Sequence, residues 1–306
     1  MKQSGIFTRL LVLAAASGAA NAFAPQSYST ASKTLSSAPT TASSSSSSSS
    51  SLNVFNPFAK KEAAPAVVEV VREEPVPGPL ETQNYVAGAV WITLIAFAFG
   101  AAPGELNSAA DQEMVTTLVT QPSPRPEQIN ELWFAIWNCF AVVPALLAAL
   151  EAPVGRGQRL PAAPFLWGSA AFGYFSLGPY FATRTMRTEP ADTEDLGWAS
   201  RNIFENRLFG VALSALALSI PFSSDLLGCD VSATIGGFIE LASTSRFVSV
   251  ASADIVIMSL LAAVLVSEDA KRRGWEDRSV PLLAASILLP VITPCLYLAA
   301  RPSLEE

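Results

Sequence analysis

The sequence contains no histidine among its 306 residues. Histidine is the commonest general base in enzymes and the commonest protein ligand of metals and haem. Its absence excludes imidazole-based hydrolysis, zinc sites that use histidine and bis-histidine haem. Cysteine is also scarce: Cys139, Cys229 and Cys295 lie far apart, and we expect them to pack as small hydrophobic residues rather than to bind a metal.

Charge is scarce as well, since 15% of the residues are charged and 50% are hydrophobic. The mean hydropathy of +0.37 is too high for an ordinary soluble domain of this length. The net charge is −7, and the basic residues are scattered rather than gathered on one face, which excludes nucleic acid as a partner. The composition therefore indicates a membrane protein that contacts the lipid bilayer.

Acidic residues are missing from the N-terminal region, where none precedes Glu62. Residues 1–22 have basic residues, an apolar run and then small residues, which is the layout of a secretory signal peptide. Residues 23–51 are acid-free and rich in Ser, Thr, Ala and Pro, which is typical of a transit peptide, and we expect them to be disordered. A polar linker over residues 52–83 and a transmembrane helical domain over residues 84–302 complete the predicted organisation.

The junction between the two N-terminal segments reads Ala22-Phe23-Ala24-Pro25. A signal peptide fused to a transit peptide, with phenylalanine at the junction, resembles the bipartite targeting sequence of plastids acquired by secondary endosymbiosis, as in diatoms. The resemblance implies a plastid membrane, with the thylakoid preferred over the envelope. The alternative is a plain secretory signal followed by a disordered Ser/Thr stalk, as the serine run of residues 43–51 would also suggest.

Long apolar stretches recur through the rest of the chain. A helix needs about 20 mainly apolar residues to cross a bilayer. The sequence therefore predicts an all-α fold, a polytopic membrane helix bundle with about six transmembrane helices. The predicted spans are residues 85–102, 132–150, 165–183, 208–222, 247–266 and 280–300. The basic residues of the loops are almost evenly divided between the two sides, so the orientation stays open.

Asp254 is an acidic residue inside the fifth apolar stretch. Because a charge within a bilayer is costly, such a residue is a candidate functional site. One interpretation is that Asp254 pairs with an arginine such as Arg207 or Arg246, or accepts hydroxyl hydrogen bonds, and so holds helices together. The other is that it binds a proton, an ion or a ligand.

Two further groups of charged residues flank the apolar stretches. At the entry of the fourth stretch we expect a polar collar, in which Arg201 and Glu205 are four residues apart. The collar consists of Arg201, Glu205 and Arg207. Between the fifth and sixth stretches we expect a solvated turn, whose basic residues could instead meet anionic lipid or an acidic partner. This turn contains Glu268, Asp269, Lys271, Arg272 and Arg273.

The sixth apolar stretch is interrupted by Pro290 and Pro294. Prolines free backbone carbonyls that line sites in transporters with broken helices, but they also occur as simple kinks in membrane helices. We favour kinks, because the two halves of the sequence show no inverted repeat.

An ordered set of short motifs fills the C-terminal part of the chain. The motifs are Thr244-Ser245-Arg246-Phe247, Asp254, Glu268-Asp269, Arg272-Arg273-Gly274, Leu289-Pro290, Pro294-Cys295-Leu296-Tyr297-Leu298 and Arg301-Pro302. Over residues 131–302 the chain resembles a family of uncharacterised multi-span membrane proteins from cyanobacteria and plastids. That resemblance implies a membrane bundle and no activity. The last stretch is also similar to the N-terminal segment of some cardiolipin synthases, but their catalytic motif requires histidine.

The sequence offers no pair of nucleophile and base and no recognisable metal set, so we do not expect an enzyme. We expect a non-catalytic assembly, maintenance or accessory factor of a membrane protein complex. The alternative is a small-solute or proton-coupled transporter that uses Asp254. Asn138, Glu205 or Glu240 could ligate the magnesium of a chlorophyll through oxygen, but we expect no bound cofactor.

Overall fold

The computed structural model describes residues 77–121, 128–188 and 196–304, all of which belong to one compact unit. Helices occur throughout these ranges and strands do not, which confirms the predicted all-α class. The predicted signal peptide, the transit peptide and most of the linker lie outside the described residues. The first described helix begins at Thr82.

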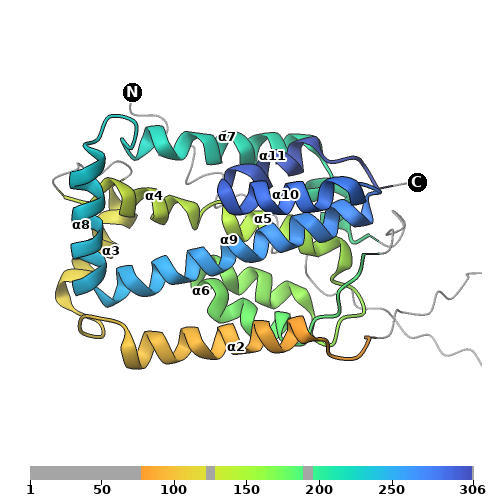
Figure 1. The fold of residues 1–306 in the computed structure, drawn as a ribbon, viewed down its shortest axis with the longest axis horizontal. Helices are drawn as coiled ribbons and strands as arrows, with labels where there is room; N and C mark the ends of the chain where they lie inside the picture. The colour runs from red at the N-terminus through yellow and green to blue at the C-terminus, as the bar shows by residue number, and fades with distance from the viewer. Residues whose placement is uncertain (1–76, 122–127, 189–195, 305–306) are drawn as a thin grey trace, which may run out of the picture. The chain divides into compact units, whose positions relative to one another are not determined.

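Among the residues that the structure describes, three helical stretches are long and apolar enough to cross a membrane. The first is α2 (Thr82–Ala96), which continues through a short π-helix to Ala101. The second joins α4 (Glu131–Cys139), α5 (Val143–Glu151) and a 3-10 turn (Ala152–Val154). The third is α9 (Arg246–Arg272), which runs lengthwise through the bundle (Figure 1). They match the first, second and fifth predicted spans.

The third predicted span is α6 (Ala162–Phe181), and it folds back on itself. Gly173 interrupts the helix with φ 53° and ψ −134°. The rings of Phe165 and Tyr180 stack with their centroids 6.0 Å apart, although 15 residues of straight helix would separate them by about 22 Å. The Ser176 hydroxyl also donates to the Phe165 carbonyl at 3.0 Å. We call this element the α6 hairpin, with its tip at Gly173.

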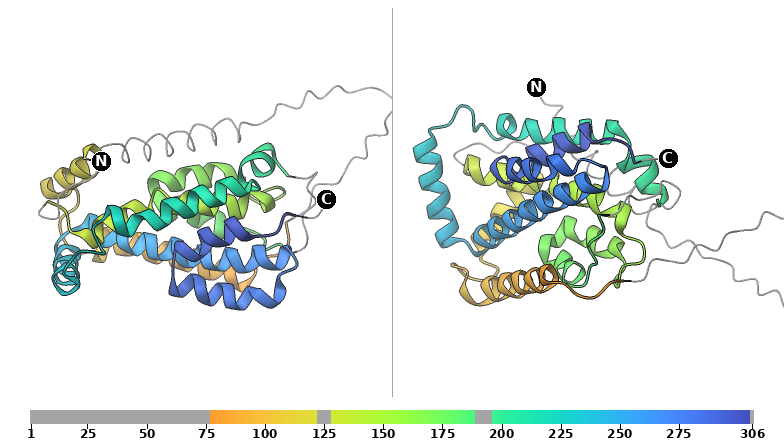
Figure 2. Two further views of the ribbon diagram at one scale, coloured as in Figure 1. Left: turned by 90° about the horizontal axis from the view of Figure 1, so that it is seen from above. Right: turned by 45° about the vertical axis from the view of Figure 1, so that its right-hand side comes forward.

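The sixth predicted span is likewise a helical hairpin, made of α10 (Glu276–Leu288) and α11 (Ile292–Ala300). The chain reverses around Pro290, where Val291 has φ 69°. The rings of Trp275, just before α10, and Tyr297, in the last turns of α11, lie 6.4 Å apart. The start of α10 and the end of α11 are therefore neighbours, and we call this pair the α10–α11 hairpin (Figure 2).

The prediction of six transmembrane helices is therefore wrong, because three stretches meet the length and hydropathy requirement. Hydropathy sums the apolar character of a stretch, and it does not register a reversal of the chain at Gly173 or Pro290. The fourth predicted span, α7 (Arg207–Ser223), is apolar but shorter, with 17 residues. The predicted kink in the sixth stretch is a full reversal of direction.

Three smaller helices occupy the ends of the bundle. Next to the first residues of α9 lie α3 (Ala109–Thr120) and α8 (Val231–Thr244), and α8 crosses the direction of α9 in Figure 1. Short polar side chains cap the N-termini of α3, α8 and α9. The capping residues are Ser108, Asp230 and Ser245, respectively. A π-helix (Ser200–Phe204) precedes α7.

The core surrounds α9, whose Met258, Ala262 and Val266 are fully buried against α5 and α6. The backbones of α7 and α11 approach each other closely at Gly210. A Cβ atom added at Gly210 would lie 2.6 Å from the Ala299 backbone nitrogen and from the Leu298 carbonyl carbon. Such contact between backbones through a small residue is the usual way in which membrane helices pack tightly.

We therefore expect Gly210→Ala to destabilise the protein by about 1–3 kcal/mol, because the new methyl group would push α11 away. The measurement is thermal unfolding of the purified protein in detergent. The matched control is Gly236→Ala in α8, where an added Cβ meets nothing within 4 Å and the helix propensity improves. Equal melting temperatures for the two variants would contradict the close packing of α7 on α11.

Candidate functional site

The charged residues singled out in the sequence gather at two places along α9. Asp254 lies two turns into the helix, beside the tip of the α6 hairpin. Glu268, Asp269 and Arg272 lie in its last turns. These two places differ in their partners and are described in turn.

Asp254 binds the tip of the α6 hairpin. Its side chain is buried, and Oδ1 accepts a hydrogen bond of 2.7 Å from the backbone N–H of Tyr174. Tyr174 is the first residue of the second helical half, so the carboxylate satisfies an N–H group that has no partner within its own helix. The positive end of a helix dipole also favours a negative charge there. The partner is thus a backbone amide rather than the expected arginine.

Gly173 makes this contact possible. Its φ of 53° is a left-handed conformation that favours glycine, and a Cβ atom at this position would collide with the Asp254 carboxylate. Glycine therefore serves two purposes at the tip, the reversal of the chain and the close approach to Asp254.

A cavity of about 780 Å³ lies between the tip of the α6 hairpin and the helices α2, α3, α4 and α9. Its wall on α9 runs from Arg246 to Asp254, eight residues or about 12 Å of helix. Most of the lining is apolar and aromatic, with Phe99, Trp137 and Phe172 on three other elements. The structure thus places Arg246 and Asp254 on one cavity, at opposite ends of its α9 wall.

The second place is centred on Asp269, which is completely buried. Its carboxylate accepts hydrogen bonds from Arg272 at 2.7 Å, Arg273 at 2.8 Å, Arg301 at 2.9 Å and the Tyr297 hydroxyl at 2.9 Å. These donors come from α9, from the turn after it and from the end of the α10–α11 hairpin. One carboxylate therefore holds both ends of that hairpin to α9.

Further carboxylates extend this cluster to other helices. Glu205, just before α7, pairs with Arg273 and Arg301 at 2.7 and 2.9 Å. Arg184, after the α6 hairpin, pairs with Glu151 at the end of α5 and with Glu268 at 2.8 and 2.6 Å. We call the whole set the arginine–carboxylate network. Its members are Glu151, Glu205, Glu268 and Asp269 with Arg184, Arg272, Arg273 and Arg301, so four negative charges balance four positive ones.

Two arginines of the network keep their charge because carboxylates surround them. Burial by itself would lower the pKa of the Arg184 guanidinium, but the Glu151 and Glu268 carboxylates outweigh burial and raise that pKa above its ordinary value. The pKa of Arg273 is raised for the same reason, against burial, by Asp269 and Glu205. The predicted solvated turn is therefore wrong for four of its five residues, and only Lys271 is exposed.

The remaining predicted residues lie apart from one another. Arg201 and Arg207 are exposed at the entry of α7, while Glu205 turns away from them into the network. Of the oxygen ligands considered for chlorophyll, Asn138 is engaged with the Phe134 carbonyl and Glu240 lies on the exposed part of α8. The described residues hold no group of three or more His, Cys, Asp or Glu side chains that could bind a metal.

Three network residues, Glu151, Arg184 and Arg301, were not among the candidate site residues of the sequence, and neither was Tyr297, which donates to Asp269. Glu151 ends an apolar stretch directly, and Arg301 follows another, so a charge at such a boundary was an available signal. Their side-chain partners lie between 28 and 96 residues away in the chain, which no local pattern reveals.

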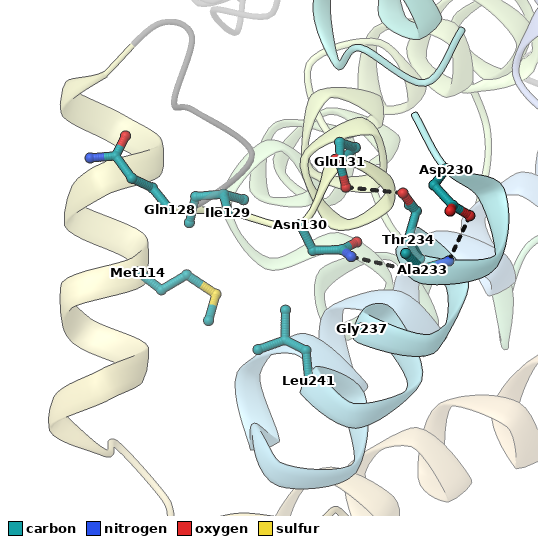
Figure 3. A pocket seen from close by; sticks show the side chains of 10 residues that line it. All are labelled: Met114, Gln128, Ile129, Asn130, Glu131, Asp230, Ala233, Thr234, Gly237 and Leu241. Atoms are coloured by element: carbon teal, nitrogen blue, oxygen red, sulfur yellow. Dashed lines mark hydrogen bonds between the residues drawn. The ribbon is translucent and has the colours of Figure 1, made fainter. Parts of the chain in front are cut away.

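A smaller pocket of about 350 Å³ lies between α3, the start of α4 and α8 (Figure 3). Its polar side chains are occupied in joining these elements. Asn130 donates to the Thr234 carbonyl at 2.9 Å, Thr234 donates to Glu131 at 3.2 Å, and Asp230 caps α8. We interpret this pocket as a helix junction.

No protein-family model, curated protein or solved structure matches this chain. The function is therefore argued from the two places on α9.

We expect Asp269→Asn to destabilise the protein by about 3–5 kcal/mol, because it leaves three guanidinium groups with too little negative charge. The measurement is the fraction of monodisperse protein that survives heating in detergent. Lys271→Gln, on the exposed side of the same turn, is the control and should stay within about 0.5 kcal/mol of the wild type. A stable Asp269→Asn protein would show that the network does not hold the hairpin.

Proposed function

We propose that this chain is a multi-pass integral membrane protein of a plastid, in the thylakoid rather than the envelope, and a non-catalytic assembly, maintenance or accessory factor of a membrane complex. The observation that carries this proposal is that the buried charges bind other groups of the protein itself. Asp254 binds a backbone amide, and the eight network residues bind one another across five segments of the chain. These groups stabilise a scaffold of two hairpins and three long helices.

The outward faces of the helices support a role among other membrane components. On α7, large apolar side chains are exposed along the whole helix. They are Leu208, Val211, Leu218 and Phe222. On α2, Tyr85, Val86 and Ile92 are exposed in the same way. A bilayer or the helices of a partner would cover such faces.

Affinity purification of the tagged protein from detergent-solubilised plastid membranes tests this proposal. We expect one membrane complex, or an assembly intermediate of it, to co-purify in fixed proportion. A tagged multi-span protein of the same membrane is the control for nonspecific recovery. Recovery of the chain with lipid alone, under detergents that preserve the known complexes of that membrane, would contradict the accessory role.

A second candidate is a small-solute or proton-coupled transporter. Its specific support is that the 780 Å³ cavity extends to Asp254, where an acidic side chain meets the N-terminus of a half-helix. Broken helices whose ends point at a substrate are typical of transporter sites.

Two substitutions of Asp254 separate these candidates. Asn keeps an oxygen that can accept the Tyr174 N–H, whereas Leu leaves this N–H without a partner, which we expect to cost about 1–2 kcal/mol. In the accessory role, Asp254→Asn keeps normal abundance and Asp254→Leu lowers it, as measured by immunoblotting of membranes. In the transporter role, the wild type in reconstituted vesicles shows a pH-dependent flux that Asp254→Asn abolishes. That loss at normal abundance would overturn the accessory role.

A further inference from the structure

Arg246 is the first residue of α9 and lines the 780 Å³ cavity. Within residues 77–121, 128–188 and 196–304 its side chain has no ion pair or hydrogen bond, and its Nε is buried without a partner. The four arginines of the network, in contrast, are all paired with carboxylates. An unpaired guanidinium in a partly buried position is costly.

The helix makes this position more unfavourable for a cation. The N-terminus of α9 carries the positive end of the helix dipole, so a basic side chain at its first residue gains nothing from the helix and is repelled by it. An anion beside Arg246 would pair with the guanidinium and would also interact favourably with the positive end of the helix dipole.

The two carboxylates on the cavity wall are already bound elsewhere. Asp111 accepts a hydrogen bond from the Ser245 hydroxyl at 2.5 Å, and it lies in the first turn of α3, where the helix dipole favours it. Asp254 accepts the Tyr174 N–H. Both carboxylates thus have a hydrogen-bond donor, whereas Arg246 is the charged residue of this lining whose side chain has no partner among the described residues.

The remainder of the cavity suits an apolar chain. Below Arg246 the wall consists of Phe247, Val250 and Ala251 on α9, faced by aromatic rings such as Trp137 and Phe172. The volume falls within the range of about 300–1,000 Å³ that is usual for small-molecule sites, which combine an apolar lining with a few polar groups. The cavity thus combines a mostly apolar lining with an arginine at one end. This combination suits an amphiphile, which has an apolar chain and a polar headgroup.

We propose that this cavity binds a single-chain amphiphile with an anionic headgroup, whose carboxylate or phosphate pairs with Arg246 and whose acyl chain lies along α9 toward the tip of the α6 hairpin. A free fatty acid and a lysophospholipid share this chemistry. The proposal goes beyond the accessory role, because it assigns a ligand to a site that the role does not require.

The test uses the full chain, purified in detergent and immobilised on scintillation beads, with isotope-labelled palmitate as the probe. We expect saturable binding that unlabelled palmitate or palmitoyl lysophosphatidate displaces. The alcohol and the amine of the same chain length should compete at least about tenfold more weakly, because neither carries the negative charge that pairs with Arg246. Acetate should not compete, since it lacks the chain. Stronger displacement by the lysophosphatidate than by palmitate supports a phospholipid source, and the reverse supports a fatty acid.

Three variants place the ligand within the cavity. Arg246→Gln should weaken palmitate binding by about tenfold or more and leave the weak binding of the alcohol unchanged. Arg246→Lys should retain most of the affinity, and it keeps the test valid if the glutamine variant fails to fold. Ala171→Trp, which fills the cavity from the α6 hairpin, should weaken palmitate and alcohol alike. Arg207→Gln, an exposed arginine outside the cavity lining, is the matched control and should bind as the wild type does.

Four outcomes would overturn the proposal: binding that does not saturate, an amine that competes as well as palmitate, full palmitate affinity in folded Arg246→Gln protein, or no effect of Ala171→Trp. None of them bears on partner recovery from plastid membranes, so failure of this proposal is distinguishable from failure of the accessory role.

Discussion

The buried carboxylate of Asp269 is the group on which the arrangement of the helices depends. It binds three guanidinium groups and one hydroxyl. These donors come from α9, from the turn after it and from the end of the α10–α11 hairpin. Removing so many charges from water is expensive, and it succeeds only when every charge is paired and hydrogen-bonded. Glu205 and the Arg184 pairs complete this balance, and in doing so they attach α7, α5 and the α6 hairpin to the same end of α9.

The second constraint operates at the other hairpin. In an apolar environment every backbone polar group needs a partner, and a helical hairpin exposes the first N–H groups of its second half. Asp254 supplies one acceptor from α9, and Gly173 allows the approach. The acidic residue that stands out in the sequence as a candidate for transport thus has a definite structural task. The same carboxylate also lines the 780 Å³ cavity, which is the specific observation in favour of the transporter alternative.

The two ends of α9 therefore have different characters. At the C-terminal end the charges are internally balanced and buried, which is typical of a structural junction. At the N-terminal end Arg246 lines a large, mostly apolar cavity and has no side-chain partner among the residues that the structure describes. The network thus joins helices at one end of α9, and the cavity lies at the other end.

The sequence by itself determined the helical class, the places of three long apolar helices among its six predicted spans, and the positions of the exceptional charges. Hydropathy over about 20 residues and a lone Asp254 are local properties, so the residues concerned reveal them directly. Only the tertiary structure decided that the third and sixth apolar stretches fold back and that the charges after α9 are buried. The reversal at Gly173 depends on a contact with Asp254, 81 residues further along the chain, and the burial of Asp269 depends on Arg301. Pairings over such separations follow from packing in three dimensions. Composition and periodicity describe neighbouring residues and therefore do not reveal them.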